Sequence, residues 1–429
     1  MIISDSIIIF QGMNYRHRHL ESKILKFSRI SPAILVTGAR QTGKSTLLLH
    51  ILKPAIKTIV FDPVVDIGNA RRDPEFFLSQ NPPPVVFDEI QYAPELLPAI
   101  KRRIDRDDKP GQYFLTGSQN LSLLKNVSES LAGRVIVLEL GTMTLAERSG
   151  RAGISSRTWI EDLFQKKAAA LLKRRLRLPA RDIEPTLFER IWRGGFPRLL
   201  DFSNDVLPDM FNSYISTYIE RDIRILLRIE DQHLFSRFFA LCAALTAQEI
   251  NHSQLGREIG ITPQTAGRWI AMFRATYQWL EIPPFHGSTI KRISGRSKGY
   301  LTDTGLAAFL HKISSPQALA AHPLQGALFE THVVLDIFRQ MCQMSVPPRI
   351  YHWRTHGGAE VDLLLERDGV FIPIEIKSGA RITDADTRGI RIFRETYPHL
   401  KHGIGCIVAG VEESFELPDG IVVLPYDIE

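Results

Sequence analysis

Residues 33–48 read AILVTGARQTGKSTLL, and this stretch decides the fold of the first third of the chain. Within it, residues 38–45 fit the pattern G-x-x-x-x-G-K-[ST], with one apolar run before the pattern and another after it. The glycines let backbone N–H groups turn inward around phosphate oxygens, and the start of the following helix adds partial positive charge. The stretch therefore predicts a phosphate-binding loop. The alternative is a glycine-rich strand–helix turn without a ligand.

The side chains of this loop are of the types that bind a nucleoside triphosphate and its metal. Lys44 is expected to reach the β- and γ-phosphates, and Ser45 is expected to ligate Mg²⁺. ATP is the expected nucleotide, since no guanine-reading motif is evident. The predicted nucleotide contacts are Gly38, Ala39, Arg40, Gln41, Thr42, Gly43, Lys44, Ser45 and Thr46.

Residues 84–89 read PVVFDE, an apolar run that ends in two carboxylates. Asp88 is expected to hold Mg²⁺ through water, and Glu89 is expected to polarise the water that attacks the γ-phosphate. Together the two residues predict hydrolysis of ATP as well as binding. The alternative is an acidic pair on the surface after a strand.

Two further residues are candidates for the catalytic site. Ser118 follows the apolar run 113–116 and is the candidate sensor of the γ-phosphate, with a simple turn as the alternative. Arg134 is a candidate arginine finger that acts on the nucleotide of a neighbouring copy, which requires a homo-oligomer. A structural salt bridge is the alternative role for Arg134.

The order of the apolar runs predicts the fold class α/β. Short runs at 33–37, 58–62, 85–88, 113–116 and 135–138 alternate with helical stretches, which is typical of a parallel sheet covered by helices. A chain of 429 residues is long enough for two or three domains. The predicted segments are a helical lead at 1–30, the P-loop ATPase domain at 31–150, a helical linker or lid at 151–230, a winged-helix domain at 231–315 and a restriction-endonuclease-like domain at 316–429.

Composition limits the partners and the compartment. The net charge of +6 permits a nucleic-acid partner without establishing one, because 53 Lys and Arg are nearly balanced by 47 Asp and Glu. The three cysteines lie far apart without a CxxC pair, which favours a reducing, cytoplasmic location. The longest apolar run near the N-terminus, residues 7–10, is too short for a membrane span, so no membrane association is expected. Met13 is a second candidate start, which would make residues 1–12 an extension absent from the native protein.

These motifs, in this order, resemble a widespread prokaryotic family of AAA-type P-loop ATPases with a C-terminal domain of unknown function. The resemblance covers nearly the whole chain and implies an ATPase core, a helical middle and a restriction-endonuclease-like end, without a known biological role. One departure is Pro197-Arg198, where the resemblance leads us to expect an acidic residue more often. The resemblance rests on residues 38–46, FDEIQ at 87–91, LTGS at 115–118, SLAGR at 130–134, GGFP at 194–197 and YIERD at 218–222.

Residues 248–280 have the pattern of a helix-turn-helix. Ser253 is expected to cap a first helix that ends near Ile259. Thr262 is expected to cap a second helix that begins at Pro263 and buries an apolar stripe. The basic segment 290–301 is expected to form a two-stranded wing.

This winged-helix pattern predicts contact with DNA, and a packing or assembly module that never touches DNA is the alternative. The cluster Glu220, Arg221 and Asp222 is expected to be a structural ion-pair network. The predicted DNA contacts are Gln264, Thr265 and Arg268 in a groove, with Lys291, Arg292 and Lys298 on phosphates.

Residues 360–377 carry acidic residues and a lysine in an order that resembles the PD-(D/E)xK nuclease core. Glu375 and Lys377 are two apart on a predicted strand and therefore share a face, while Asp362 begins the neighbouring strand. Glu330 lies on the helix before them. Glu330, Asp362 and Glu375 are the candidate Mg²⁺ ligands, and Lys377 would orient the metal-bound water or stabilise charge on the phosphate. A surface ion pair is the alternative for Glu375 and Lys377.

Two function classes follow from these motifs. In the first, the protein is a Mg²⁺-dependent ATPase that acts on DNA, with a possible metal-dependent deoxyribonuclease at its C-terminal end. In the second, it is an ATP-operated binding switch for protein partners, with a catalytically inert nuclease-like domain. A protein-remodelling machine without nucleic acid would need a substrate pore loop, which is not identifiable in the sequence.

Overall fold

The computed structural model describes residues 15–428 apart from 63–67, 120–130, 132, 154–156, 176, 179–185, 220–230 and 288–294. Across these ranges, no helix is long and apolar enough to cross a bilayer. Three sets of predictions concern residues outside the described ranges: the extension at 1–12, the network of Glu220, Arg221 and Asp222, and the phosphate contacts of Lys291 and Arg292.

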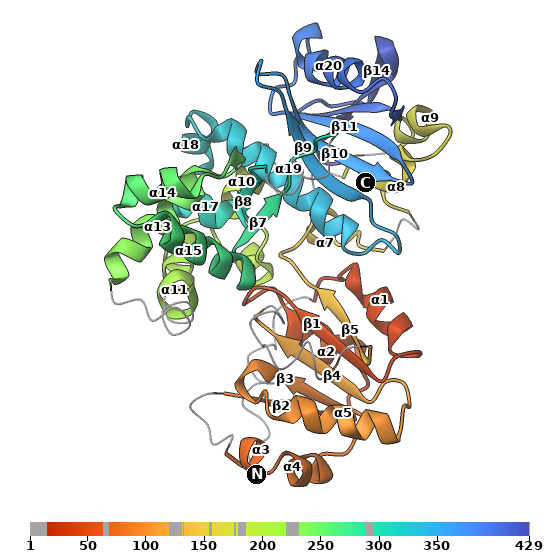
Figure 1. The fold of residues 1–429 in the computed structure, drawn as a ribbon, viewed down its shortest axis with the longest axis vertical. Coiled ribbons are helices and arrows are strands. Elements are labelled where there is room, and N and C mark those ends of the chain that lie inside the picture. Colours follow the sequence, from red (N-terminus) through yellow and green to blue (C-terminus); the bar gives the residue numbers. More distant parts are fainter. Residues whose placement is uncertain are drawn as a thin grey trace.

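The first part of the chain folds around a parallel sheet, drawn in the lower half of Figure 1. Each pairing between its neighbouring strands is parallel. The sheet confirms the α/β class that the alternating apolar runs predicted. In sheet order the strands are β2 (Lys57–Val60), β3 (Val85–Asp88), β4 (Tyr113–Gly117), β1 (Ala33–Thr37) and β5 (Val135–Glu139).

Helices cover both faces of this sheet. Ala33 and Leu35 of β1 belong to the apolar cluster that contains residues of α5. Ile34 and Val36 belong to the cluster formed with α1 and α2. Both faces of β1 are therefore buried, which explains why its sequence is apolar without alternation. The helical elements are α1 (Leu20–Phe27), α2 (Lys44–Ile51), α3 (Gly68–Arg72), α4 (Pro74–Gln80), the 3-10 turn η2 (Ile90–Tyr92) and α5 (Leu96–Arg106).

The middle of the chain is mainly helical and lies on the left of Figure 1. A small antiparallel sheet of order β6-β8-β7 packs among its helices. The elements are α10 (Leu187–Arg193), η4 (Pro197–Asp201), α11 (Leu207–Tyr214), η5 (Ile215–Ile219), α13 (Gln232–Ala244), β6 (Gln248–Glu249), α14 (His252–Ile259), α15 (Pro263–Ala275), β7 (Trp279–Ile282), β8 (Lys298–Leu301), α17 (Thr304–Leu310) and α18 (Pro316–Ala320).

Helices α14 and α15 are the pair predicted from residues 248–280. Thr262 caps α15, which begins at Pro263 as predicted. The cap of α14 differs from the prediction, because the side chain of Asn251, and not that of Ser253, accepts the first backbone N–H groups. The apolar stripe predicted on α15 is buried, from Ala266 to Phe273.

The last part of the chain is a second α/β unit, shown in blue in Figure 1. Leu363 and Leu365 of β10 pack in the cluster that contains α19, whereas Leu364 packs with Phe393 of α20. The two helices therefore lie on opposite faces of a mixed sheet. Its order is β14 (Phe415–Leu417), β15 (Ile421–Pro425), β13 (Gly405–Ala409), β11 (Val370–Lys377), β10 (Glu360–Arg367) and β9 (Arg349–Arg354), with β12 (Lys401–His402) paired to β11; the helices are α19 (Gln325–Met341), η6 (Asp384–Thr387), α20 (Arg388–Thr396) and η7 (Pro418–Gly420).

The segment predicted as one linker at 151–230 divides between two parts of the molecule. Helix α8 (Trp159–Leu163) contacts α19, and Arg177 forms a bridge with Ile428 at the end of the chain. Figure 1 shows α8 and α9 (Ala168–Leu172) beside the C-terminal sheet, after the short helix α7 (Leu145–Arg148). Helix α10, in contrast, contacts α17 and α18. The first half of the segment therefore joins the C-terminal unit, and the second half joins the middle helices.

Candidate functional site

The predicted phosphate-binding loop joins the end of β1 to the start of α2. Gly38 and Gly43 have φ angles of +143° and +91°, which side chains rarely adopt. A Cβ atom at Gly38 would also lie 2.1 Å from the carbonyl oxygen of Leu140. The conformation of the loop therefore requires glycine at Gly38 and favours it at Gly43.

Lys44 lies buried at the start of α2, and its ammonium group closes the loop. Nζ donates to the carbonyl oxygens of Gly38 at 3.0 Å and Ala39 at 2.8 Å. Burial lowers the pKa of Lys44, against the attraction of the nearby carboxylates. An ammonium group in this place can move from loop carbonyls to phosphate oxygens. The other predicted contacts, Arg40, Gln41, Thr42, Ser45 and Thr46, lie in the loop and the first turn of α2.

Ser45 and Asp88 meet where α2 begins and β3 ends. The Ser45 hydroxyl lies 2.7 and 2.8 Å from the two carboxylate oxygens of Asp88. Burial raises the pKa of Asp88, although hydrogen bonds from Thr116 and Ser45 oppose the shift. Hydroxyl and carboxylate oxygens are the donors that Mg²⁺ takes in proteins, so this pair fits the predicted metal.

Thr116 contacts the carboxylate of Asp88 and the backbone of Glu89. Its hydroxyl donates to Asp88 and accepts from the backbone N–H of Glu89 at 2.9 Å. Glu89 itself has a φ angle of +57°, so this backbone sits in the left-handed region. Thr116 is absent from the sequence-based set of site residues. Its position on β4, the neighbour of β3 in the sheet, is the signal that could have found it.

Gln91 connects the predicted base with the predicted sensor. Its amide nitrogen donates to the carboxylate of Glu89 and to the Ser118 hydroxyl, the latter at 2.9 Å. Gln91 is 9% exposed and Ser118 is also buried, so solvent competes little for these bonds. Ser118 and Glu89 are therefore bridged by a single side chain, that of Gln91, which is the proximity that a γ-phosphate sensor would require. Sequence reasoning missed the role of Gln91, which belongs to the FDEIQ stretch at 87–91.

Arg134 lies at the amino ends of the strands, whereas the P-loop of its own chain lies at their carboxyl ends. Strands β1 and β5 are parallel, with Ala33 opposite Val135 and the P-loop at the other end of β1. The Arg134 guanidinium forms an ion pair with Asp105. A finger role for Arg134 therefore requires a neighbouring copy and stays a prediction.

The three parts of the chain match three described families. Residues 31–149 match the family described as AAA domain. The chain carries an AAA-type P-loop ATPase domain. Residues 184–317 match a domain of unknown function, DUF8612, and residues 325–428 match another, DUF4143.

Similar proteins are known as sequences and as solved structures. Uncharacterized proteins of Mycobacterium bovis and Mycobacterium tuberculosis are each 28% identical over 419 residues, which is 97% of this chain and 85% of theirs. A Walker-type ATPase of Pyrococcus abyssi has a TM-score of 0.42 at 14% identity, covering 68% of this chain and 94% of its own. RuvB of Thermotoga maritima has a TM-score of 0.29 at 17% identity, covering 60% and 88%.

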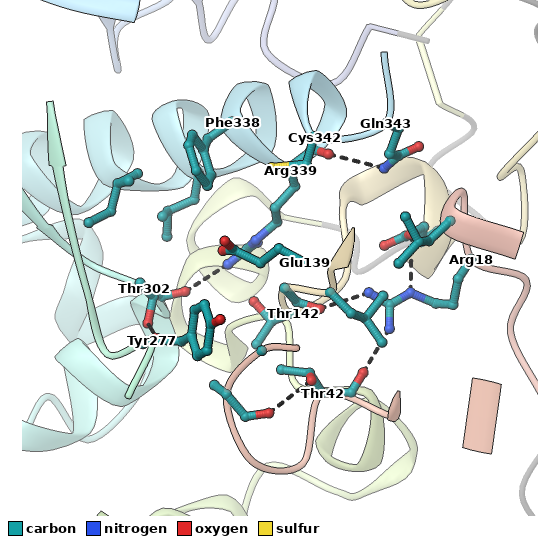
Figure 2. A pocket seen from close by; sticks show the side chains of 18 of the residues that line it. Arg18, Thr42, Glu139, Thr142, Tyr277, Thr302, Phe338, Arg339, Cys342 and Gln343 are labelled. Atoms are coloured by element: carbon teal, nitrogen blue, oxygen red, sulfur yellow. Dashed lines mark hydrogen bonds and ion pairs between the residues drawn. The ribbon is translucent and has the colours of Figure 1, made fainter. Parts of the chain in front are cut away.

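A cavity of about 80 Å³ lies behind the P-loop, where the AAA domain meets the rest of the chain (Figure 2). Thr42 of the loop lines one side, and Tyr277, Thr302 and Arg339 line the other. Glu139 at the end of β5 projects into this space (Figure 2). The cavity is large enough to hold several water molecules among these polar groups.

Polar contacts cross this cavity from the P-loop to α19. The Tyr277 side chain lies close to Thr37 at the end of β1. The Thr302 hydroxyl donates to the Tyr277 carbonyl at 2.7 Å, and Arg339 donates to the Thr302 carbonyl at 2.7 Å. Partial desolvation at the cavity raises the pKa of Glu139 to about 7, although the residue keeps solvent contact, and the Arg339 charge only partly offsets the shift. A continuous set of contacts therefore joins β1 to the long helix of the C-terminal unit.

The predicted DNA contacts separate in the structure. Gln264 and Arg268 are exposed on α15, and Thr265 is half-buried beside them. Lys298 differs from the prediction of an exposed phosphate contact, because it is 8% exposed and its ammonium group faces Glu330 and Asp362. The reason is that β8 packs against the C-terminal unit, so this lysine of the predicted wing is covered and neutralised.

All four residues predicted for the C-terminal site come together. Lys377 Nζ lies 3.2 Å from Glu375 Oε2 on the same face of β11. Asp362 of β10 accepts the backbone N–H of Ile376 at 2.9 Å. Glu330 reaches the same place from α19, where it contacts Lys298. Sequence reasoning missed Lys298 as a member of this group, because β8 is distant in sequence.

The Mg²⁺ ion that the nuclease resemblance implies does not fit this group. Lys298 Nζ lies 2.6 Å from Glu330 Oε1 and 3.2 Å from Asp362 Oδ1, where a metal would have to bind. Burial and the Asp362 charge raise the pKa of Glu330 to about 8 and also raise that of Glu375, which disfavours the ionised ligands that a metal needs. Within the described part of the chain, no three His, Cys, Asp or Glu side chains are grouped to hold a metal.

Proposed function

We propose that this protein is a Mg²⁺-dependent ATP hydrolase that works as an ATP-operated switch. The observation that carries the proposal is the group of Lys44, Ser45, Asp88 and Glu89 where α2 begins and β3 ends. It combines an ammonium group, two hard oxygen ligands and a carboxylate fixed by its backbone. These are the parts that phosphoryl transfer to water requires.

Each residue of this group has its own task. Lys44 would leave the carbonyl oxygens of Gly38 and Ala39 and bind the β- and γ-phosphates. Ser45 and Asp88 would hold Mg²⁺, which neutralises charge on the phosphates when bound. Glu89 would orient the attacking water.

Gln91 would couple the γ-phosphate to Glu89. It touches both Ser118 and Glu89, so a phosphate sensed at Ser118 would change the position of Glu89 through one shared amide. Arg134 could add positive charge from a second copy in a homo-oligomer.

The steady-state release of phosphate from Mg-ATP tests hydrolysis. Lys44→Ala should lose measurable turnover, because the ammonium group that binds the phosphates is gone. Lys53→Ala is the matched control, since Lys53 is exposed just beyond the same helix. Equal turnover in wild type and Lys44→Ala would refute the assignment.

The switch part of the proposal rests on the contacts behind the P-loop. Tyr277 of the middle helices reaches Thr37, and Arg18 donates to the carbonyl of Thr42 at 2.7 Å. A change in loop conformation on ATP binding would therefore shift Tyr277 in the middle part, and Arg339 of α19 is linked to Tyr277 through Thr302. Protein partners that recognise one arrangement of these parts would bind in a nucleotide-dependent manner, with the nuclease-like unit catalytically inert.

Contact with DNA is the second candidate function, and the exposed face of α15 favours it. Gln264 and Arg268 lie on this helix close to its N-terminal end and are open to solvent. If α14, α15 and the β7–β8 pair act as a winged helix, these side chains would meet a DNA groove. Stimulation of the ATPase by duplex or single-stranded DNA would support this candidate.

A further inference from the structure

The acidic site of the C-terminal unit receives a lysine from another part of the chain. Lys298 belongs to β8 of the middle sheet, whereas Glu330 lies on α19 and Asp362 on β10. We infer that the Lys298 ammonium is the resident cation of this site and closes it to divalent metal ions. The inference concerns the C-terminal unit and does not depend on ATP hydrolysis.

The distances place the ammonium group between two carboxylates. Nζ lies 2.6 Å from Glu330 Oε1 and 3.2 Å from Asp362 Oδ1, and the Lys298 side chain is 11% exposed. A divalent ion bound to the same two oxygens would need distances of about 2.0–2.6 Å to each. It would then stand where Nζ stands, and two cations cannot share that position.

Other donors of the protein also reach the three carboxylates. The Tyr300 hydroxyl donates to Glu330 Oε1 at 2.8 Å, and the backbone N–H of Ile376 donates to Asp362 Oδ2 at 2.9 Å. Lys377 pairs with Glu375 Oε2 at 3.2 Å. Each carboxylate therefore already accepts at least one donor of the protein itself, so a metal would have to displace several contacts at once.

The fold holds Lys298 at this place rigidly. Strand β8 is paired on both sides, with Glu249 and Ile282 opposite Lys298. The segment after β7 is fastened to β9, because the backbone N–H of Phe285 donates to the His352 carbonyl at 2.6 Å. The lysine is thus part of a packed junction between the middle sheet and the C-terminal unit, and not a flexible arm.

Binding of Mn²⁺ to the full chain without nucleotide tests this inference, with the free ion measured by electron paramagnetic resonance. Wild type and Glu375→Gln should bind the same number of ions, because the acidic site takes none. Lys298→Met should bind one ion more, and adding Glu375→Gln to it should remove that ion. Lys298→Arg, which keeps the charge, and Lys401→Met, an exposed lysine, should match wild type.

Two outcomes would overturn the inference. One is an ion bound by wild type and lost in Glu375→Gln, which would show an open metal site. The other is a folded Lys298→Met variant, checked by circular dichroism, that gains no ion. If Lys298→Met does not fold, the comparison of wild type with Glu375→Gln still decides, because both retain Lys298.

Discussion

The Thr116 hydroxyl links the Asp88 carboxylate to the backbone of Glu89. It donates to Asp88 and accepts from the backbone N–H of Glu89. Thr116→Val keeps the shape and removes both bonds. Hydrogen bonds to charged groups are worth about 1.5–3 kcal/mol. We therefore expect kcat for ATP to fall about 10- to 100-fold.

Steady-state kinetics at several Mg²⁺ concentrations would measure this effect. Thr396→Val is the matched control, because Thr396 is exposed on α20 far from the AAA domain and also donates to a backbone carbonyl. Unchanged kcat in Thr116→Val would show that Asp88 and Glu89 keep their positions without it.

At the residue scale, the sequence predicts those site residues that belong to short, recognisable motifs. The loop from Gly38 to Ser45 and the acidic pair at the end of β3 follow from local patterns. Thr116 and Gln91 do not, because their roles depend on which strands are neighbours and where a side chain points. The carboxyl ends of neighbouring parallel strands meet at one edge of the sheet, so a polar residue near the end of β4 is a candidate member of the site.

At the element scale, the central strands of the AAA domain were predictable because β1, β3 and β4 are buried on both faces. Continuous apolar runs such as residues 33–37 then mark the strands to within two residues. The packing of residues 151–230 was harder to predict, because the sequence of a short amphipathic helix does not indicate which neighbour the helix packs against. Its two halves join different parts of the molecule.

Helix α15 carries the prediction that decides between DNA and protein partners. Arg268 is exposed on this helix, so Arg268→Ala removes a charge without disturbing the core. If α15 contacts DNA, Arg268→Ala should bind DNA severalfold more weakly than wild type. If Arg268 contacts a phosphate, its removal should also reduce the slope of log affinity against log salt concentration by about one. Fluorescence anisotropy with labelled duplex DNA at several salt concentrations measures both.

The matched control is Arg388→Ala, since Arg388 is exposed on α20 in the C-terminal unit. Equal affinities of wild type and Arg268→Ala would favour the packing or assembly role of the helix pair, as would the absence of binding altogether.

At the scale of the whole molecule, the contacts between distant segments were beyond prediction. Lys298 reads in the sequence as an exposed basic residue of a wing, and only the packing of β8 on the C-terminal unit turns it inward. The cavity behind the P-loop is a similar case. Its lining comes from residues as far apart as Arg18 and Gln343.

Glu139, which lines this cavity, should make the stability of the protein depend on pH. Partial desolvation at the cavity raises its pKa from 4.5 to about 7, although the residue keeps solvent contact. The folded protein therefore binds the proton more tightly than the unfolded chain. The contribution of Glu139 to stability therefore falls as the pH rises from about 4.5 to about 7, and then stays constant. Water inside the cavity screens the charge and reduces the size of the effect.

Glu139→Gln should remove this dependence. Its thermal midpoint relative to wild type should rise between pH 5 and pH 7 and level off above, as measured by differential scanning fluorimetry across that range. Glu258→Gln, on the exposed side of α14, should show no such trend. A constant difference between Glu139→Gln and wild type at all pH values would contradict the raised pKa of this carboxyl group.

The proposed function requires that the AAA domain hydrolyse ATP with Glu89 as the residue that orients the water. Steady-state Mg-ATPase turnover of Glu89→Gln tests it most directly, with ATP binding measured in parallel and Glu95→Gln, an exposed carboxylate of the same loop, as the control. We predict that Glu89→Gln binds ATP but turns it over at least about 100-fold more slowly, while Glu95→Gln matches wild type. Turnover of Glu89→Gln at the wild-type rate would contradict the account.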